Sequence, residues 1–155
     1  MTQPVADPLP GHPGSPEHRT YLALQRLAAR QQYAAAELLR GHDLSAPQFN
    51  VLRILRGAGD GGLRCSDIGH RLLVHDPDVT RLLDRLEKAG RVRRARDPHD
   101  RRVVMTHLTA EGRAVLSALD APLSELHARQ FAALSPERLE LLAELLGDLT
   151  LEDHR

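Results

Sequence analysis

The amino-acid sequence predicts a mainly α-helical protein with one small β-hairpin, and three observations lead to this fold class. Leu and Ala dominate the apolar residues, whereas aromatic residues make up only 3% of the chain, which favours helices packed through aliphatic side chains. Helix-capping residues followed by apolar residues at three- and four-residue steps recur along the chain. Residues 91–108 combine two strand-like segments with a polar turn between them.

The totals indicate one domain in a cytoplasmic protein. A chain of 155 residues is long enough for a single real core. No apolar run is long enough to cross a bilayer, no secretory signal is visible, and a single cysteine, Cys65, permits no intrachain disulfide. Residues 1–16 hold five of the ten prolines, so we expect a disordered arm ahead of one domain over 17–155.

Caps and apolar periodicity place the first two helices. The first is predicted from about residue 17 to Arg40, and Gly41 ends it. The second starts at Ser45, because Gln48 completes a capping box three residues later. Their apolar faces are formed by Leu24, Leu27, Gln31, Ala34 and Leu38 in the first helix, and by Phe49, Leu52, Ile54 and Leu55 in the second.

A glycine-rich loop over 57–62 precedes two further helices. The first of them is short and starts at Ser66. The next is predicted to use Asp76 as its N-cap, with Pro77 and Asp78 in its first turn, and to end at Gly90. It turns an apolar face inward, formed by Val79, Leu82, Leu83 and Leu86.

The hairpin follows, and two helices complete the chain. Residues 91–96 and 102–108 are the predicted strands, and their tip is the turn 97–100, Asp-Pro-His-Asp. Thr109 caps the next helix, which is predicted to reach about residue 133 with a kink or break at Pro122. The last helix starts at Ser135-Pro136, and its apolar seam of Leu139, Leu142, Leu146 and Leu149 is suited to a partner chain.

A helix, a short helix, a helix and a hairpin in this order form a winged helix-turn-helix, in which the hairpin is the wing. A neutral chain here places six arginines within residues 91–102. The segment from Leu63 to Arg102 contains eleven Lys/Arg and seven Asp/Glu, a net charge of +4. Because the whole chain is neutral, the rest of it carries a net charge of −4. This pattern favours a polyanion that meets one part of the protein, and a helix and a hairpin fit DNA grooves. A winged helix that binds only protein is the alternative, and it does not need such a basic tip.

Residues 79–113 resemble the MarR (multiple-antibiotic-resistance regulator) family of bacterial transcription factors. The matching segments are VTRLLDRLEKAG, DPHDRR and LTAEGR. The resemblance implies an obligate homodimer, with residues 44–108 as the DNA-binding lobe and residues 17–43 with 109–155 as the dimerisation lobe. It also implies a repressor of double-stranded, pseudo-palindromic operators that a small phenolic or anionic effector releases. No enzymatic motif is present, so we expect no catalysis.

The resemblance assigns the residues that contact DNA. Thr80 and Arg81 match recognition-helix positions, and Arg85 is predicted to reach the DNA backbone from the next turn. In the wing, Arg102 matches a minor-groove probe that Asp100 orients through a bidentate pair. Arg94, Arg96 and Arg101 are expected to contact phosphates or a groove.

The family's effector pocket lies between the two lobes, and four residues match its position. They are Tyr33, His42, Phe49 and Arg53. Their apolar walls and few polar groups are typical of a small-molecule site, although an ordinary core or surface role is the commoner one for any single residue.

Some residues depart from the pattern or leave an alternative open. Arg91 occupies a place usually given to an apolar strand residue, so either it snorkels or the first wing strand is short. Asp78 is either a cap alone or an acceptor for a cytosine amino group, and the cap is favoured. Cys65 is interpreted as a small residue at a helix start rather than a redox sensor. The nine histidines show no metal-ligand spacing, so no metal or other cofactor is expected; a metal- or redox-responsive regulator stays the alternative.

Overall fold

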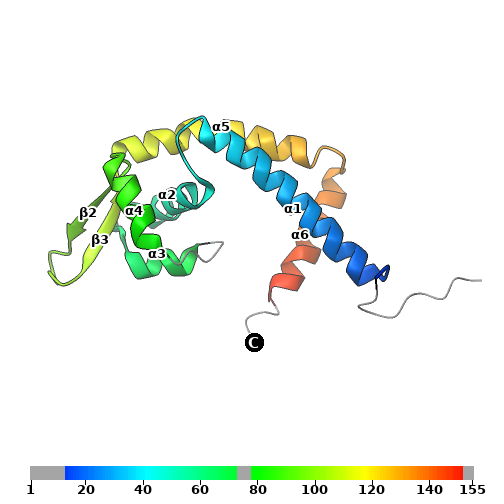
Figure 1. Ribbon diagram of the computed structural model, residues 1–155, viewed down its shortest axis with the longest axis horizontal. Coiled ribbons are helices and arrows are strands. Elements are labelled where there is room, and N and C mark those ends of the chain that lie inside the picture. Colours follow the sequence, from blue (N-terminus) through cyan, green and yellow to red (C-terminus); the bar gives the residue numbers. More distant parts are fainter. Residues whose placement is uncertain (1–12, 73–77, 152–155) are drawn as a thin grey trace, which may run out of the picture.

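The computed structural model describes residues 13–72 and 78–151 and confirms a mainly helical protein with a small antiparallel sheet (Figure 1). Most of the arm predicted over 1–16 lies outside the described residues. The elements are α1 (Pro16–Arg40), α2 (Ala46–Ala58), a 3₁₀ turn (Gly59–Gly61), β1 (Leu63–Arg64), α3 (Cys65–Arg71), α4 (Val79–Lys88), β2 (Val92–Arg96), β3 (Val104–Leu108), α5 (Ala110–Gln130) and α6 (Pro136–Leu151).

Side-chain caps start α2 and α5 where the sequence predicts them. Ser45 accepts a hydrogen bond from the backbone N–H of Gln48, whose side chain accepts one from the Ser45 N–H, so the capping box of α2 is confirmed. Thr109 accepts from the N–H of Gly112 at 3.0 Å and starts α5. These caps satisfy backbone donors that have no partner within the helix.

The structure corrects several predicted elements, and α3 starts at Cys65, one residue before the predicted Ser66. The wing hairpin belongs to a three-stranded sheet of order β1-β3-β2, and the two-residue strand β1 pairs Leu63 with Thr106. Helix α4 starts at Val79 with Asp78 as its N-cap, two residues later than predicted, while Asp76 and Pro77 lie outside the described residues. Helix α5 continues through Pro122 without a break and ends at Gln130. Pro122 has no backbone N–H and so cannot donate to the carbonyl four residues earlier, but the turns on both sides of it keep the helix continuous.

The core joins the end of α1, the loop after it, α2, α3, α4, the sheet and α5 as far as Leu123. Its buried side chains are Leu39, Leu44, Val51, Leu52, Leu55, Ile68, Leu82, Leu83, Leu86, Val92, Leu108, Leu116, Leu119 and Leu123. Burial of each large aliphatic side chain contributes roughly 1.5–3 kcal/mol before entropy losses are counted. This core packs the described residues of 44–108, called here the winged lobe, against α5.

Away from the winged lobe, α1 and the second half of α5 run side by side, and α6 follows at the far end (Figure 1). Helix α6 exposes a row of large apolar side chains: Leu139, Leu141, Leu145, Leu146 and Leu149. No helix in the described residues is long and apolar enough to cross a membrane. The apolar surface of α6 is thus left to be covered by something other than this chain's own core.

Candidate nucleic-acid interface

Helix α4 has one face in the core and one in solvent. Leu82, Leu83 and Leu86 are buried, whereas Thr80, Arg81 and Arg85 are exposed. The three predicted contacts on this helix therefore lie on its outer side, which is the side that can enter a groove. Because the apolar face of α4 is packed in the core, the exposed side chains are held in position on its outer face.

The N-terminus of α4 is organised by Asp78. One carboxylate oxygen accepts from the backbone N–H of Arg81 at 3.1 Å, and the other lies 3.4 Å from Arg81 Nε. Asp78 is thus a helix cap, as the favoured interpretation held. The same contact orients the side chain of Arg81 at the exposed end of the helix.

The wing tip is stiffened by two carboxylates. Asp97 accepts from the backbone N–H groups of His99 at 2.7 Å and Asp100 at 3.2 Å, and these hydrogen bonds hold the pKa of Asp97 below its usual range. Asp100 accepts from the backbone N–H of Arg102 at 3.0 Å. Arg96 donates to the carbonyl of Arg101 at 3.1 Å. The loop is therefore held by its own polar groups.

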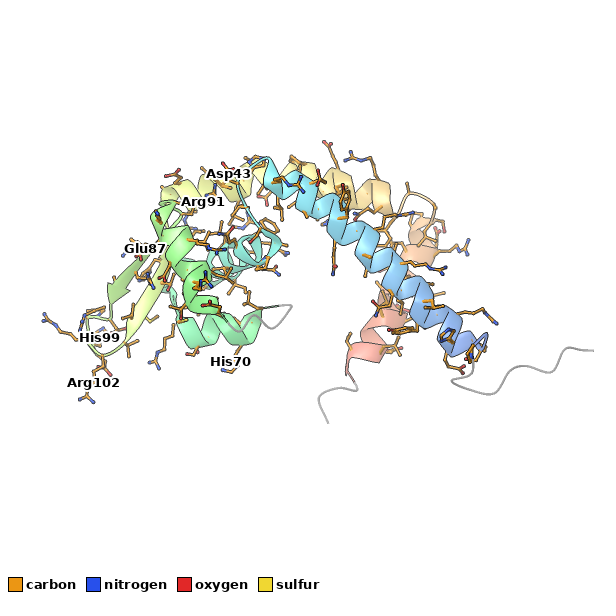
Figure 2. The ribbon with its side chains drawn as sticks, in the orientation of Figure 1. Asp43, His70, Glu87, Arg91, His99 and Arg102 are labelled. Atoms are coloured by element: carbon orange, nitrogen blue, oxygen red, sulfur yellow. The ribbon has the colours of Figure 1, made fainter. Side chains whose placement is uncertain are left out.

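Asp100 acts on Arg102 in a different way from the prediction. Among the described residues, no ion pair joins the Asp100 carboxylate to the Arg102 guanidinium, so the expected bidentate pair is absent. The carboxylate is occupied by the backbone of the turn, which is the nearer donor. Arg102 is exposed at the end of the wing, and its side chain points away from the body (Figure 2). Arg101 is exposed beside it.

Arg94 lies in an ion-pair network within the protein. Its guanidinium donates to Glu87 at 2.6 and 2.8 Å and to Asp84 at 2.5 Å, and its backbone N–H donates to Glu87 at 2.9 Å. The hydrogen bonds from Arg94 lower the pKa of Glu87, and the same partners raise the pKa of Arg94. Arg94 therefore ties β2 to α4 in this structure, and its contact with DNA stays a prediction.

Arg91 fastens the wing to the loop after α1. Its guanidinium donates to the backbone carbonyls of His42 at 2.7 Å and Asp43 at 2.8 Å (Figure 2). The first wing strand starts one residue later, at Val92, so the prediction of a short strand was the better of the two alternatives. The charge that was unexpected in a strand thus serves to satisfy two backbone carbonyls of the loop that follows α1.

Two exposed arginines at the wing, Arg64 and Arg93, were not among the predicted contacts. Arg64 lies in β1, beside the wing strand β3, and its charge contributes to the lowered pKa of Asp97. A two-residue strand leaves no periodic signal, so the sequence alone does not bring Arg64 to the wing. The structure adds it to the basic surface.

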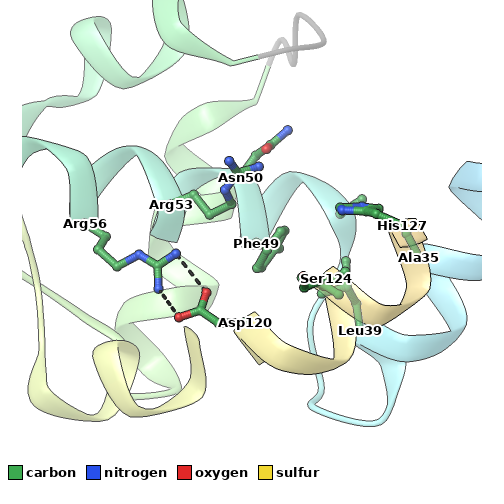
Figure 3. Close-up of a pocket in the computed structure, with 11 residues that line it drawn as sticks. Ala35, Leu39, Phe49, Asn50, Arg53, Arg56, Asp120, Ser124 and His127 are labelled. Carbon is green, nitrogen blue, oxygen red and sulfur yellow. Dashed lines mark hydrogen bonds and ion pairs between the residues drawn. The ribbon is translucent and has the colours of Figure 1, made fainter. Parts of the chain in front are cut away.

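A cavity of about 400 Å³ lies where α1, α2 and α5 meet (Figure 3). It is lined by Ala35, Leu39, Ala46, Phe49, Asn50, Arg53, Arg56, Asp120, Leu123, Ser124 and His127. Phe49 and Arg53, two of the four residues expected at an effector site, line it, and the Arg53 guanidinium lies 5.8 Å from the centre of the Phe49 ring. Tyr33 is 69% exposed and does not line this cavity, and neither does His42.

The cavity contains an ion pair that the sequence did not suggest. Arg56 of α2 donates to both carboxylate oxygens of Asp120 of α5, at 2.9 and 3.0 Å (Figure 3). This bidentate pair lowers the pKa of Asp120. The two residues are 64 positions apart, which is why no local pattern reveals the pair.

Comparison with known proteins places this geometry in a family. The MarR family model matches residues 44–104. The chain is 42% identical over 87 residues to the HTH-type transcriptional regulator TtmR of Methylorubrum extorquens, which is 56% of this chain and 44% of that protein. It is 28% identical over 129 residues to the homoprotocatechuate degradative operon repressor of Escherichia coli, 83% of this chain and 85% of the relative.

Solved structures agree with the sequence relatives. The MarR transcription factor of Planctomyces limnophilus is 36% identical with a TM-score of 0.67, over 88% of this chain and 98% of that one. A mutant of Escherichia coli MarR complexed with operator DNA is 26% identical with a TM-score of 0.75, over 84% of this chain and 93% of that one. With an exposed recognition helix, an arginine-tipped wing and these relatives, the chain belongs to the MarR family of helix-turn-helix transcriptional regulators.

Proposed function

We propose that the protein is a homodimeric repressor that binds a pseudo-palindromic DNA operator and leaves it when a small phenolic or anionic effector binds. In this proposal α4 enters the major groove and the wing enters the neighbouring minor groove. The observation that carries it is the pairing of an exposed recognition-helix face with arginines that lack an ion-pair partner at the described wing tip. Such a protein acts in the cytoplasm, where bacterial operators lie.

The arginines divide into two groups in this proposal, and Arg91 and Arg94 form the second, whose guanidinium groups bind other parts of this chain. Arg81, Arg85, Arg96, Arg101 and Arg102 are the exposed cations that contact DNA, and Thr80 and Asp100 serve as a recognition-helix contact and as a loop brace. Arg64 joins the first group. Contacts with phosphates supply most of the affinity, and the minor groove concentrates the negative potential that attracts arginine.

The homodimer is supported by α6. Its exposed leucines form an apolar surface of a kind that single soluble chains rarely leave uncovered. Two copies related by a two-fold axis cover the same surface on each other. This arrangement presents two recognition helices, as a two-fold symmetric operator requires.

The effector site is supported by the cavity between α1, α2 and α5. It borders the winged lobe through α2 and the long helices through α1 and α5, so an occupant contacts both parts. A ligand that fits one arrangement of these parts better than another shifts the population between them. Phe49 and Arg53 provide an apolar ring and a cation.

A titration with DNA tests the proposed function. A duplex selected by the protein from a random library is titrated by fluorescence anisotropy at several salt concentrations. Arg102→Ala is expected to weaken binding about tenfold or more and to reduce the salt slope by about one, because one cation near the phosphates is lost. Arg129→Ala removes an exposed arginine of α5 and serves as the control, with unchanged binding expected. A folded Arg102→Ala protein with wild-type affinity rejects the role of the wing.

A further inference from the structure

We propose that Arg91 is a positioning residue for DNA binding. Its guanidinium links the base of the wing to the end of α1, and this link fixes the distance between the two recognition helices of a dimer. The inference rests on the proposed homodimeric repressor and adds the residue that holds each winged lobe at the angle an operator requires. It starts from one side chain that joins parts of the chain 48 and 49 positions apart.

The backbone of Arg91 already joins the wing to two helices. Its N–H donates to the carbonyl of Leu86 in α4 at 2.9 Å, and its carbonyl accepts from the N–H of Thr109 at the start of α5 at 3.1 Å. The main chain at residue 91 is therefore held between the recognition helix and α5. The side chain of Arg91 starts from this fixed point.

The receiving end of the link is a tightly wound turn after α1. The N–H of Asp43 donates to the carbonyl of Arg40 at 3.1 Å. The next N–H, that of Leu44, donates to the carbonyl of Leu39, also at 3.1 Å, and this pair of hydrogen bonds is a Schellman motif. Asp43 has a φ of 52° and is the only non-glycine residue with a positive φ in the described part of the chain. Leu39 and Leu44 are buried in the core, so both packing and hydrogen bonds hold the turn.

Two donors of one guanidinium meet two consecutive carbonyls of this turn. Arg91 Nη2 donates to the carbonyl of His42 at 2.7 Å, and Nη1 donates to that of Asp43 at 2.8 Å (Figure 2). A guanidinium is planar and its donors point in fixed directions, so two such bonds define an orientation as well as a distance. Hydrogen bonds from a charged donor are also stronger than those between neutral groups.

The link supplies a direction that the core does not. Burial of aliphatic side chains favours contact between α1, α2 and α5, but it has no preferred angle. A wing attached through α5 alone could rotate slightly about the axis of that helix. A second attachment, to the end of α1, opposes this rotation. In the proposed dimer both helices extend into the dimerisation lobe, so Arg91 sets the angle between that lobe and the wing.

The link acts twice in a dimer. Two recognition helices reach successive major grooves only when they lie about one turn of DNA apart, roughly 34–36 Å. Without the Arg91 side chain each winged lobe samples more angles, and the binding-competent spacing becomes a smaller fraction of the population. A single half-site sets no spacing, so its affinity does not depend on the link. The expected loss is therefore confined to DNA with two half-sites.

Binding to three duplexes tests the inference by fluorescence anisotropy with the full-length protein. They are the duplex selected from a random library, the same duplex with one base pair inserted at its centre of symmetry, and a duplex with one half-site. The insertion moves one half-site by about 3.4 Å and is expected to weaken wild-type binding about tenfold or more. Arg91→Met is expected to bind the selected duplex about five- to tenfold more weakly and the half-site within about twofold of wild type. Its further loss on the insertion is expected to be about threefold or less.

Two further variants separate the link from charge and folding. Arg40→Met, at the end of α1, removes an exposed arginine that pairs with Glu37 and is the control, with wild-type binding expected on all three duplexes. Arg91→Lys retains the charge and a donor, so values between wild type and Arg91→Met are expected. It carries the test if circular dichroism shows that Arg91→Met does not fold. Light scattering checks that the variants remain dimers.

Equal losses on all three duplexes would make Arg91 an ordinary DNA contact or a residue of general stability, and would overturn the inference. So would wild-type sensitivity of Arg91→Met to the inserted base pair, or an Arg91→Met protein that has become a monomer. If only Arg91→Lys folds, wild-type values in that variant overturn it. A wild type that does not prefer two half-sites rejects the proposed homodimeric repressor together with this inference, whereas the other outcomes leave the proposed function standing.

Discussion

The guanidinium of Arg94 and the carboxylate of Glu87 hold the first wing strand against the recognition helix. Their side chains are 29% and 37% exposed, so solvent screens the pair in part. With Asp84 included, one arginine pairs with two carboxylates of α4. In the proposed complex with DNA, these carboxylates would otherwise face the phosphates as unpaired negative charges. The contact thus positions the wing and lowers the charge cost of placing α4 in a groove.

Arg94→Met is expected to lower the free energy of unfolding by on the order of 1 kcal/mol at pH 7, a value discounted for exposure. Urea titration followed by circular dichroism measures the loss, since the chain contains no tryptophan. Arg93→Met is the control, because Arg93 is an exposed neighbour on the same strand. Equal stability of the two variants contradicts the structural role of Arg94.

The same pair predicts a dependence on pH. The pKa of Glu87 is lowered from 4.5 by Arg94, so the folded state binds the proton less readily than the unfolded state. The stabilisation is therefore complete above about pH 4.5 and disappears as the pH falls through the lowered pKa. The difference in stability between wild type and Arg94→Met is expected to shrink at acid pH, and a constant difference down to about pH 3 would count against it.

Single residues also show the limit of prediction from sequence. Arg91, Arg94 and Arg102 look alike as members of one basic segment. In the structure, Arg91 binds loop carbonyls, Arg94 binds carboxylates and Arg102 remains exposed. Their partners lie on other elements, so local patterns cannot assign them. The roles that follow from local chemistry alone, such as the caps at Ser45 and Thr109, were predicted correctly.

At the scale of elements, α5 packs directly on the base of the wing. A Cβ added to Gly112 would collide with the carbonyl oxygen of Arg91 and would lie 2.7 Å from Leu108 Cδ1. Thr109 completes the contact, because its hydroxyl donates to the carbonyl of Gly90 and its N–H donates to that of Arg91. Only glycine permits this approach of helix and strand.

Gly112→Ala is expected to destabilise the protein by about 1–3 kcal/mol, because the backbone must shift to admit the methyl group. Gly57→Ala, in α2 with nothing within 4 Å of the new Cβ, is expected to be neutral or to stabilise slightly. Thermal melting of the two variants distinguishes them. Equal melting temperatures would mean that α5 and the wing are not tightly packed.

Elements with a periodic or capped pattern were predictable, and the shortest element was not. The long helices follow from their apolar repeats and caps, whereas β1 has two residues and is defined only by its pairing with β3. The start predicted for α4 was two residues early, since Asp76-Pro77 and Asp78 both resemble a helix start in the sequence. The family resemblance was confirmed by the comparisons.

At the scale of the whole molecule, the row of leucines on α6 predicts the assembly. Leu145→Lys places a charge on the exposed apolar face and is expected to convert dimers into monomers at micromolar concentration, measured by light scattering after size-exclusion chromatography. Glu140→Lys puts the same side chain on the opposite side of α6 as the control, since Glu140 is exposed and lies away from the leucine row. A wild type that elutes as a monomer, or a variant that remains dimeric, contradicts the proposed interface.

The close join between α5 and the wing has a mechanical consequence. Helix α5 has 21 residues and is rooted in the winged lobe at Thr109 and Gly112, so the lobe turns wherever the helix axis turns. At about 1.5 Å per residue it forms a lever arm of roughly 30 Å, and a tilt of about 5° at one end displaces the other by about 3 Å. A small tilt imposed at the far end of α5, away from the winged lobe, therefore becomes a larger displacement of the wing's arginines. The length of the helix alone produces this increase.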